Sequence, residues 1–178
     1  MRLFVAVWPS PSVGRQLAAL DRPSRPGVRW TTEDQWHVTL RFLGQILDED
    51  LQRVKGALSA LESVGPSRPV TAVAGPGLIR LGPSVLCVPV AGLEALAASV
   101  VRVTAELGEP PDERPFRGHI TVARGARHGK LRLPAPAPAS APIAGSWEVD
   151  EVTLVASVLH PAGARYEVIG RYPLAPAP

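Results

Sequence analysis

One four-residue pattern, histidine, apolar residue, threonine, apolar residue, occurs twice in the chain. The first copy is His37-Val38-Thr39-Leu40 and the second is His119-Ile120-Thr121-Val122, at an offset of 82 residues. The chain has only four histidines, and with threonine at about 4% of positions, two such pairs would arise by chance in about 1% of comparable chains. The motifs therefore indicate an internal repeat, so the fold must contain two equivalent strands.

The segments that precede the motifs support this repeat. Leu3–Val7 is a short apolar run typical of a strand, and the same offset carries it onto 85–89, inside the apolar run Val85–Val90. Apolar residues at helical spacing follow each run, namely Val13, Leu17 and Leu20 in the first half and Leu93, Leu96, Val100, Val103 and Leu107 in the second. Ser10-Pro11 predicts the start of the first helix. The repeated order predicts two strand-helix-strand lobes around a pseudo-two-fold axis, with a groove between them.

The predicted organisation is one bilobal domain over residues 1–178, with halves of roughly 1–82 and 83–172 and a frayed tail at 173–178. A chain with 46% apolar and 20% charged residues is typical of a globular protein. The one cysteine, Cys87, excludes an internal disulfide. The N-terminal apolar run is too short for a signal peptide, and no run approaches the roughly 18 residues of a membrane span. We therefore expect a cytoplasmic monomer that does not contact membranes.

Arginine supplies 17 of the 19 basic residues, and the formal net charge is +3. A guanidinium group can pair with a phosphate through two hydrogen bonds, so this balance fits a phosphate-bearing partner. Arginine in place of lysine also reflects genome composition, which weakens the inference. The basic segment 124–132 could contact an RNA backbone or could simply be solvated.

Side chains alternate along a strand, so His37 and Thr39 are expected to share one face, and His119 and Thr121 likewise. Each strand would then offer an imidazole and a hydroxyl to the groove. The alternative is two strand histidines satisfied by local hydrogen bonds, with threonine present for its β propensity.

Two histidines suit proton transfer at both ends of a displacement at phosphorus. An unperturbed imidazole pKa near 6.5 lets one ring accept a proton while another donates one. Cleavage without a metal also needs donors on the non-bridging oxygens, which Thr39 and Thr121 can supply. Arg41, two residues beyond Thr39, is expected on the same face, in contact with the phosphate. Arg124, three residues beyond Thr121, reaches the groove only through a bulge or a strand end.

Other kinds of site fit the sequence less well. No further ligand stands at metal-binding spacing near either motif, and the chain has no GxSxG, P-loop or GxGxxG segment. His128 and His160 are expected to be solvated loop residues. Trp30 and Phe116 could stack on a nucleobase, and packing in the core is the alternative for both.

Four longer segments carry a resemblance to a known family. They are RLFVAVWP near the start, VRWTTEDQWHVTLRFLG around the first motif, RPFRGHITVAR around the second, and the closing SVLHPAGARYEVIGRYPL. In this order they make the chain similar to the RNA 2′,3′-cyclic phosphodiesterases, also called 2′-5′ RNA ligases, of the two-histidine phosphoesterase superfamily. The resemblance covers nearly the whole chain and implies an α+β fold, in which two antiparallel sheets flank the groove.

The resemblance also implies an activity. It implies hydrolysis of an RNA terminal 2′,3′-cyclic phosphate to a 2′-phosphomonoester, without a metal or nucleotide cofactor, and a related 2′-5′ ligation. By motif position, His37 would donate the proton to the leaving 3′ oxygen and His119 would accept the proton of the attacking water. The groups implied to hold the phosphate are those of Thr39, Thr121, Arg41 and Arg124.

The implied substrates are RNA 3′ ends that carry the cyclic phosphate, with tRNA fragments as one candidate, or small cyclic nucleotides. Two alternatives stay open at this point. One is a phosphodiesterase of another cyclic phosphate or of a 2′-5′ oligonucleotide, and the other is a module that binds RNA ends without turnover.

Overall fold

A computed structural model describes residues 1–125, 142–160 and 163–176 of the chain. The strands of the described part are β1 Arg2–Val7, β2 Val28–Trp30, β3 Val38–Gln45, β4 Val70–Ala74, β5 Ile79–Leu81, β6 Val85–Ala91, β7 His119–Gly125, β8 Gly145–Val149, β9 Glu151–His160 and β10 Gly163–Pro173. The α-helices are α1 Pro11–Ala18, α2 Leu51–Ser59, α3 Leu61–Val64 and α4 Glu94–Val103, and short 3-10 turns cover Glu33–Gln35 and Asp48–Asp50.

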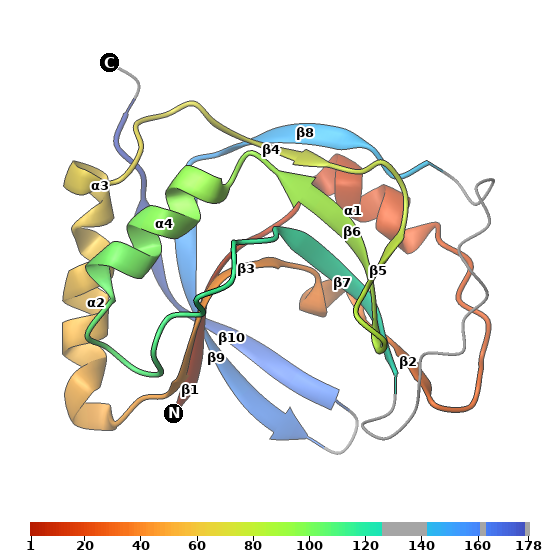
Figure 1. Cartoon of the computed structure of the whole chain (residues 1–178), viewed down its shortest axis with the longest axis horizontal. Coiled ribbons are helices and arrows are strands. Elements are labelled where there is room, and N and C mark those ends of the chain that lie inside the picture. The colour runs from red at the N-terminus through yellow and green to blue at the C-terminus, as the bar shows by residue number, and fades with distance from the viewer. Residues whose placement is uncertain (126–141, 161–162, 177–178) are drawn as a thin grey trace.

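The strands form an antiparallel, curled sheet in the order β10-β9-β1-β3-β7-β6-β4-β8, with β2 added to β7 and β5 added to β6 (Figure 1). One lobe is centred on β1, which lies between β3 and β9, and the other on β6, which pairs with both β7 and β4. A single residue pair, Val38 with Ile120, joins β3 of one lobe to β7 of the other. The prediction of an α+β fold with antiparallel strands is confirmed.

The repeat is visible in the elements. An offset of 82 carries α1 onto residues 93–100, most of α4, and carries β1 and β3 onto β6 and β7. Each of the two equivalent helices packs on the other lobe. Gln16 of α1 exchanges hydrogen bonds with the backbone of Ala144, at the start of β8, while α4 packs against β3.

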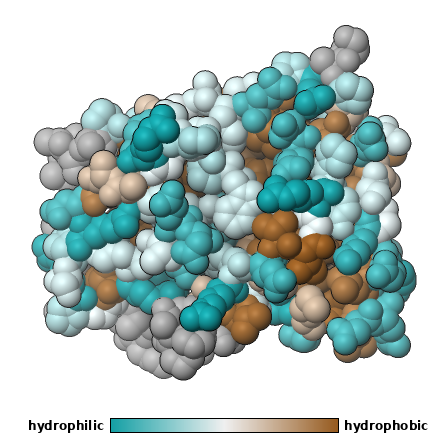
Figure 2. Space-filling view, turned by 180° about the vertical axis from the view of Figure 1, so that it is seen from behind, coloured by the Kyte–Doolittle hydropathy of each residue, from teal (hydrophilic) through white to brown (hydrophobic). Residues whose placement is uncertain are grey.

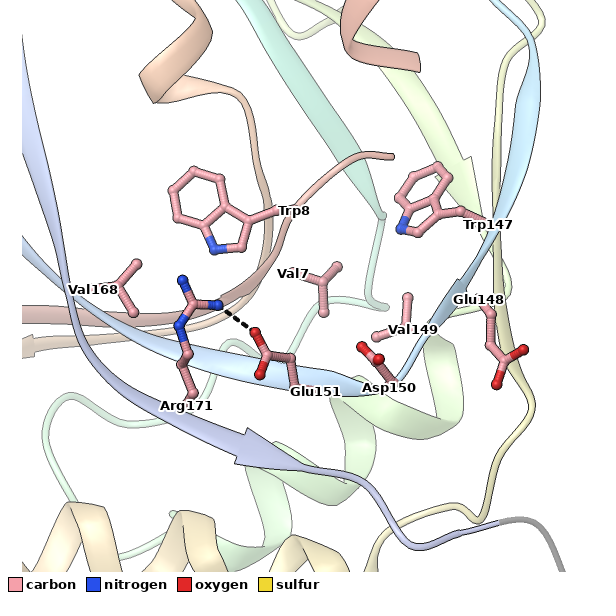
Figure 3. A pocket seen from close by; sticks show the side chains of 9 residues that line it. All are labelled: Val7, Trp8, Trp147, Glu148, Val149, Asp150, Glu151, Val168 and Arg171. Carbon is pink, nitrogen blue, oxygen red and sulfur yellow. Dashed lines mark hydrogen bonds and ion pairs between the residues drawn. The ribbon is translucent and has the colours of Figure 1, made fainter. Parts of the chain in front are cut away.

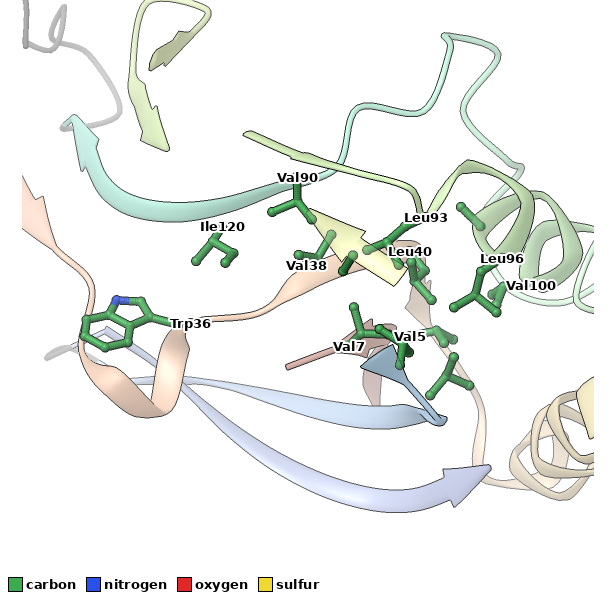
Figure 4. Packing of buried hydrophobic residues seen from close by; sticks show 14 of the residues in the cluster. Val5, Val7, Trp36, Val38, Leu40, Val90, Leu93, Leu96, Val100 and Ile120 are labelled. Carbon is green, nitrogen blue, oxygen red and sulfur yellow. The ribbon is translucent and has the colours of Figure 1, made fainter. Parts of the chain in front are cut away.

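Helix α1 begins where the sequence predicts. The hydroxyl of Ser10 accepts a hydrogen bond from the amide of Val13, and Pro11 is the first helical residue. Val13 and Leu17 are fully buried. They belong to the large core that also takes in Leu96 and Val100 of α4 (Figure 4). Burial stabilises the fold by about 1.5–3 kcal/mol for each such side chain.

The surface away from the view of Figure 1 is mixed, with apolar residues gathered on one half (Figure 2). The large apolar side chains that remain exposed include those of Met1, Phe42, Leu47 and Val64. None of the helices in the described ranges is long and apolar enough to cross a membrane.

Two expectations about the C-terminal part need correction. The sequence predicts a frayed tail from residue 173, but Leu174 is only 2% exposed and its amide donates to the carbonyl of Asp150. The carbonyl of Ala175 also accepts from the amide of Arg68. Order extends this far because the Leu174 side chain completes the core. His160 ends β9 rather than lying in a loop, whereas His128 and most of the basic segment 124–132 lie outside the described residues.

Candidate active site

The two histidine motifs meet where β3 and β7 pair. Val38 and Ile120 are opposite one another, and both side chains are fully buried in the core. In an antiparallel pair, residues on either side of such a position point to the other face. Continuing the register by one residue in one direction sets His37 opposite Thr121. Continuing it in the other direction sets Thr39 opposite His119. All four side chains of the motifs therefore lie on the face of the sheet opposite the buried Val38 and Ile120. This is the face that the predicted groove would occupy, and we call it the groove face.

Both histidines are held by the same local contact. The Nδ1 atom of His37 lies 2.8 Å from the carbonyl oxygen of Gln35, and Nδ1 of His119 lies 2.7 Å from that of Arg117. A carbonyl can only accept, so each Nδ1 carries the hydrogen and each neutral ring keeps its Nε2 lone pair. For His37 this nitrogen lies 3.1 Å from the hydroxyl of Thr39. Each ring can therefore accept or donate a proton through Nε2.

Aromatic side chains surround the His37 ring. Its centroid lies 4.7 Å from that of Phe4, 5.8 Å from that of Trp8 and 5.1 Å from that of Tyr166. This burial, opposed by the hydrogen bond to Gln35, lowers the pKa of His37 from 6.5 to about 4. Electrostatic interactions with Arg124 and His119 lower the pKa of His37 further, so both side chains are close enough to act on the ring. At neutral pH, His37 of the free protein is uncharged.

Arg41 does not lie in the groove, contrary to the expectation from alternation. Thr39 pairs with Ala6, but Arg41 pairs with Val5, so Leu40 is an extra residue that forms a β-bulge. The bulge turns Arg41 to the core side, where it is only 4% exposed.

There the Arg41 guanidinium binds the C-terminal end of α4. It donates to the hydroxyl of Thr104 and to the carbonyl oxygens of Val101, Leu107 and Glu109 at 2.6–3.1 Å. The negative end of the helix dipole favours a cation at this place. Arg41 therefore links β3 to α4 and does not contact a ligand in the groove.

Arg124 reaches the groove by the same device in the second strand. Thr121 pairs with Cys87 and Ala123 pairs with Leu86, which leaves Val122 as the extra residue of a bulge. Val122 and Ala123 are both buried in the core, so Arg124 returns to the face of Thr121. The two bulges decide which arginine faces the groove. Strict alternation predicts Arg41 on the groove face and Arg124 on the core face, and the structure has the reverse.

Thr31 also supports the site, although nothing in the sequence points to it. Its hydroxyl donates to the carbonyls of the bulge at Thr121 and Val122 and accepts from the indole N–H of Trp36. Its amide also donates to the carbonyl of Val122 at 2.9 Å. Thr31 is 6% exposed. A buried threonine beside a short strand carries no sequence signal that would distinguish it from a core residue.

The aromatic residues near the groove are not the expected ones. Trp30 pairs with Ala123 and packs against the core, with its indole N–H on the carbonyl of Pro23. Phe116 also packs against the core. Trp30 thus faces the core side of the sheet, opposite the groove face. The stacking roles of Trp30 and Phe116 stay predictions. The sequence does indicate the position of Phe4. Leu3 and Val5, on either side of it, are core residues, so alternation along the strand turns Phe4 to the other face, where it meets His37.

A pocket of about 330 Å³ lies beside Trp8, and neither histidine of the two motifs is among its lining residues (Figure 3). Its lining consists of Val7, Trp8, Trp147, Glu148, Val149, Asp150, Glu151, Val168 and Arg171. Arg171 forms an ion pair with Glu151, so the remaining carboxylates leave the lining negative. This charge disfavours a phosphate anion, which is better placed at Arg124.

Neither a reactive thiol nor a metal site is found in the part of the chain that the structure describes. Burial raises the pKa of the Cys87 thiol to about 11, so this thiol is protonated at neutral pH. Across residues 1–125, 142–160 and 163–176, no three histidine, cysteine, aspartate or glutamate side chains are grouped to hold a metal ion.

Comparison with known proteins places this geometry in context. The family described as LigT like Phosphoesterase matches residues 7–73. An RNA 2′,3′-cyclic phosphodiesterase of Geobacillus stearothermophilus is 32% identical over 87% of this chain, which spans only 50% of that relative's length. A protein of the same name from Archaeoglobus fulgidus is 30% identical, over 94% of this chain and 97% of the relative.

Solved structures share the whole fold. The crystal structure of TT0787 of Thermus thermophilus superposes with a TM-score of 0.75 at 30% identity, over 98% of both chains. Escherichia coli LigT in complex with 3′-AMP gives a TM-score of 0.71 at 25% identity, over 97% of both chains.

Proposed function

Because the chain belongs to the LigT-like phosphoesterase family, we propose that it hydrolyses the terminal 2′,3′-cyclic phosphate of RNA to a 2′-phosphomonoester. The name shared by its relatives supports this substrate. The observation that carries the proposal is the matched pair of histidines. In each, Nδ1 is held by the carbonyl two residues earlier, which leaves proton transfer to Nε2, the atom that in His37 contacts the Thr39 hydroxyl.

The proposed reaction moves two protons and needs no metal. Water attacks the phosphorus atom in line with the 3′ oxygen, and the Nε2 atom of one histidine takes a proton from it. The bond between phosphorus and the 3′ oxygen breaks, and the other histidine gives its Nε2 proton to that oxygen. The product is a 2′-phosphomonoester with a free 3′ hydroxyl, and the proton balance of the histidine pair is restored by exchange with solvent.

We assign proton donation to His37 and proton acceptance from water to His119. The low pKa of His37 in the free protein requires that the bound phosphate raise it. An anion beside the ring favours the protonated form, and it also neutralises Arg124, one of the charges that lower the pKa. If binding does not raise this pKa, the two roles exchange, because the pseudo-two-fold symmetry allows either direction.

The phosphate oxygens are assigned to the hydroxyls of Thr39 and Thr121 and to the guanidinium of Arg124. Donors aimed at these oxygens stabilise the charge that develops in the transition state. Arg41 is left out of this set because its guanidinium is buried against α4. The related ligation, in which a 5′ hydroxyl in place of water attacks the cyclic phosphate, would give the 2′-5′ linkage that the family resemblance implies.

The test is turnover of purified protein in excess EDTA. RNA fragments and mononucleotides that end in a 2′,3′-cyclic phosphate, other cyclic phosphates and 2′-5′ oligonucleotides are supplied in parallel, and phosphorus NMR identifies the products. We expect 2′-phosphomonoesters from the 2′,3′-cyclic substrates. Tight binding of these RNA ends with no product would instead establish a binding module, and loss of turnover in EDTA would contradict the metal-free mechanism.

A further inference from the structure

A second arginine lies beside Arg124 on the groove face. Arg29 of β2 pairs directly with Arg124 of β7, and directly opposed residues of antiparallel strands point to the same side of the sheet. The neighbours of Arg29 support this orientation. Val28 and Trp30 both pack against the core, so the residue between them must face away from it.

The pair is exposed and carries two like charges. Arg29 and Arg124 are both exposed, and within the described residues neither takes part in an ion pair. Side chains that oppose one another across two strands have their Cβ atoms about 4.5–5.5 Å apart, and like charges at this distance destabilise the sheet. Anions bound at the two guanidinium groups would remove this repulsion.

The pair is also placed next to the reaction site. The charge of Arg124 acts on His37, so Arg124 marks the edge of the space that would hold the reacting phosphate. Arg29 lies one strand further out, on β2, which fills the edge of β7 where β3 no longer pairs with it. A second phosphate at Arg29 would therefore neighbour the first without competing with it.

We propose that Arg29 binds the phosphodiester on the 5′ side of the terminal nucleotide. This inference rests on the proposed function and deepens it, because it makes the substrate an RNA chain of two or more nucleotides rather than a mononucleotide. A mononucleoside 2′,3′-cyclic phosphate has only the reacting phosphate and leaves Arg29 without a ligand.

The test compares adenosine 2′,3′-cyclic phosphate with the dinucleotide ApA that ends in a 2′,3′-cyclic phosphate, for wild type, Arg29→Gln and Arg29→Lys. We expect Arg29→Gln to lower kcat/KM for the dinucleotide about tenfold and to change that for the mononucleotide less than twofold. Arg29→Lys should recover part of the loss, because it keeps the charge. The matched control is Arg15→Gln, an exposed arginine on α1, which should change neither substrate.

Salt dependence provides a second readout. The dinucleotide should show a steeper fall of kcat/KM with salt than the mononucleotide, by about 0.7 in the log–log slope for one extra phosphate contact, and Arg29→Gln should remove the difference. An equal effect of Arg29→Gln on both substrates, or no effect on either, overturns the inference.

Failure of the proposed function is distinguishable from failure of this inference. If wild type turns over neither substrate, the proposed function fails, and dissociation constants for adenosine 2′-phosphate and for ApA with a terminal 2′-phosphate decide the role of Arg29. A loss of affinity in Arg29→Gln that is confined to the dinucleotide supports the inference, and affinities that match those of wild type contradict it.

Discussion

Val38 and Ile120, which occupy the same position in the two copies of the repeat, pair with each other across the junction of the lobes. A residue that pairs with its own repeat equivalent must lie on the pseudo-two-fold axis. Both side chains are buried, so the histidines and threonines beside them turn to the opposite face together. This one pair brings the two motifs side by side on one face of the sheet.

Replacement of either histidine by alanine is predicted to lower kcat/KM for a 2′,3′-cyclic phosphate by at least about 10²-fold. Each variant removes one of the two proton transfers and leaves the sheet intact. Circular dichroism and denaturant unfolding check that the fold is retained, and Arg15→Ala, at an exposed position of α1 outside the motifs, is a suitable control. Full activity in either histidine variant would refute paired acid–base catalysis.

The pKa of His37 is predicted to be near 4 in the free protein and to rise when a nucleoside 2′-phosphate binds. The anion supplies a negative charge and neutralises Arg124, and both changes favour the protonated ring. NMR titration of the imidazole signals, with and without the ligand, measures both values. Arg124→Gln should raise the pKa of the free form by itself. A value that stays near 4 with ligand bound would assign His37 as the base.

Stability is predicted to fall below pH 6.5 because of His37. The unfolded chain takes up a proton near pH 6.5 and the folded chain only near pH 4, so the unfolded state binds more protons between these values. The loss begins as the pH falls below 6.5, amounts to roughly 2 kcal/mol at pH 5 and is complete below pH 4, at about 3 kcal/mol.

Urea unfolding of wild type and His37→Gln at pH 7.5 and pH 5 measures this loss. The variant has no imidazole at this position, so its stability should fall by about 2 kcal/mol less than that of wild type between the two pH values. Equal losses in the two proteins would show that His37 titrates normally.

Arg41 and Arg124 are predicted to affect different properties. Arg41→Met leaves the carbonyls of Val101, Leu107 and Glu109 without their donor. The buried carbonyl of Leu107 alone should cost roughly 1–3 kcal/mol of stability. Arg124→Gln is an exposed change that should cost at most about 0.5 kcal/mol of stability but lower kcat/KM about 10- to 100-fold. Urea unfolding and steady-state kinetics, measured on both variants, separate the two effects.

The kinetics of Arg41→Met should be measured at temperatures below its thermal unfolding, so that lost stability is not mistaken for lost activity. At low temperature, the folded fraction of Arg41→Met should keep the KM of wild type. A raised KM with unchanged stability in Arg41→Met would return this arginine to the phosphate site.

Thr31→Val is predicted to lower stability by roughly 1–3 kcal/mol and to lower kcat/KM as well. The variant loses the hydroxyl that bonds the bulge carbonyls and leaves the buried indole N–H of Trp36 without an acceptor. The bulge directs Arg124, so its loosening should also reduce the effect of Arg124 on the pKa of His37. Thr31→Ser, which keeps the hydroxyl, should recover both properties. Loss of stability with no change in this pKa would limit Thr31 to a structural role.

Local signals predicted much of this molecule. The offset of 82 residues, the Ser10-Pro11 helix start and the two histidine motifs all depend on a few neighbouring residues, and the structure agrees with each of them. The aromatic environment of His37 was not predicted, because Phe4, Trp8 and Tyr166 come from distant segments that meet only when β1, β9 and β10 pair.

The sequence by itself determined the repeat, the strand-helix-strand order of each half, and the chemical groups that the two motifs present. Only the tertiary structure decided which arginine joins them. Alternation gives the groove to Arg41, but bulges at Leu40 and Val122 reverse the faces of Arg41 and Arg124. In each bulge one strand has an extra residue relative to its partner, β3 relative to β1 and β7 relative to β6. The direction of a side chain beyond a bulge therefore depends on pairing across the sheet and not on the residues nearby in the chain.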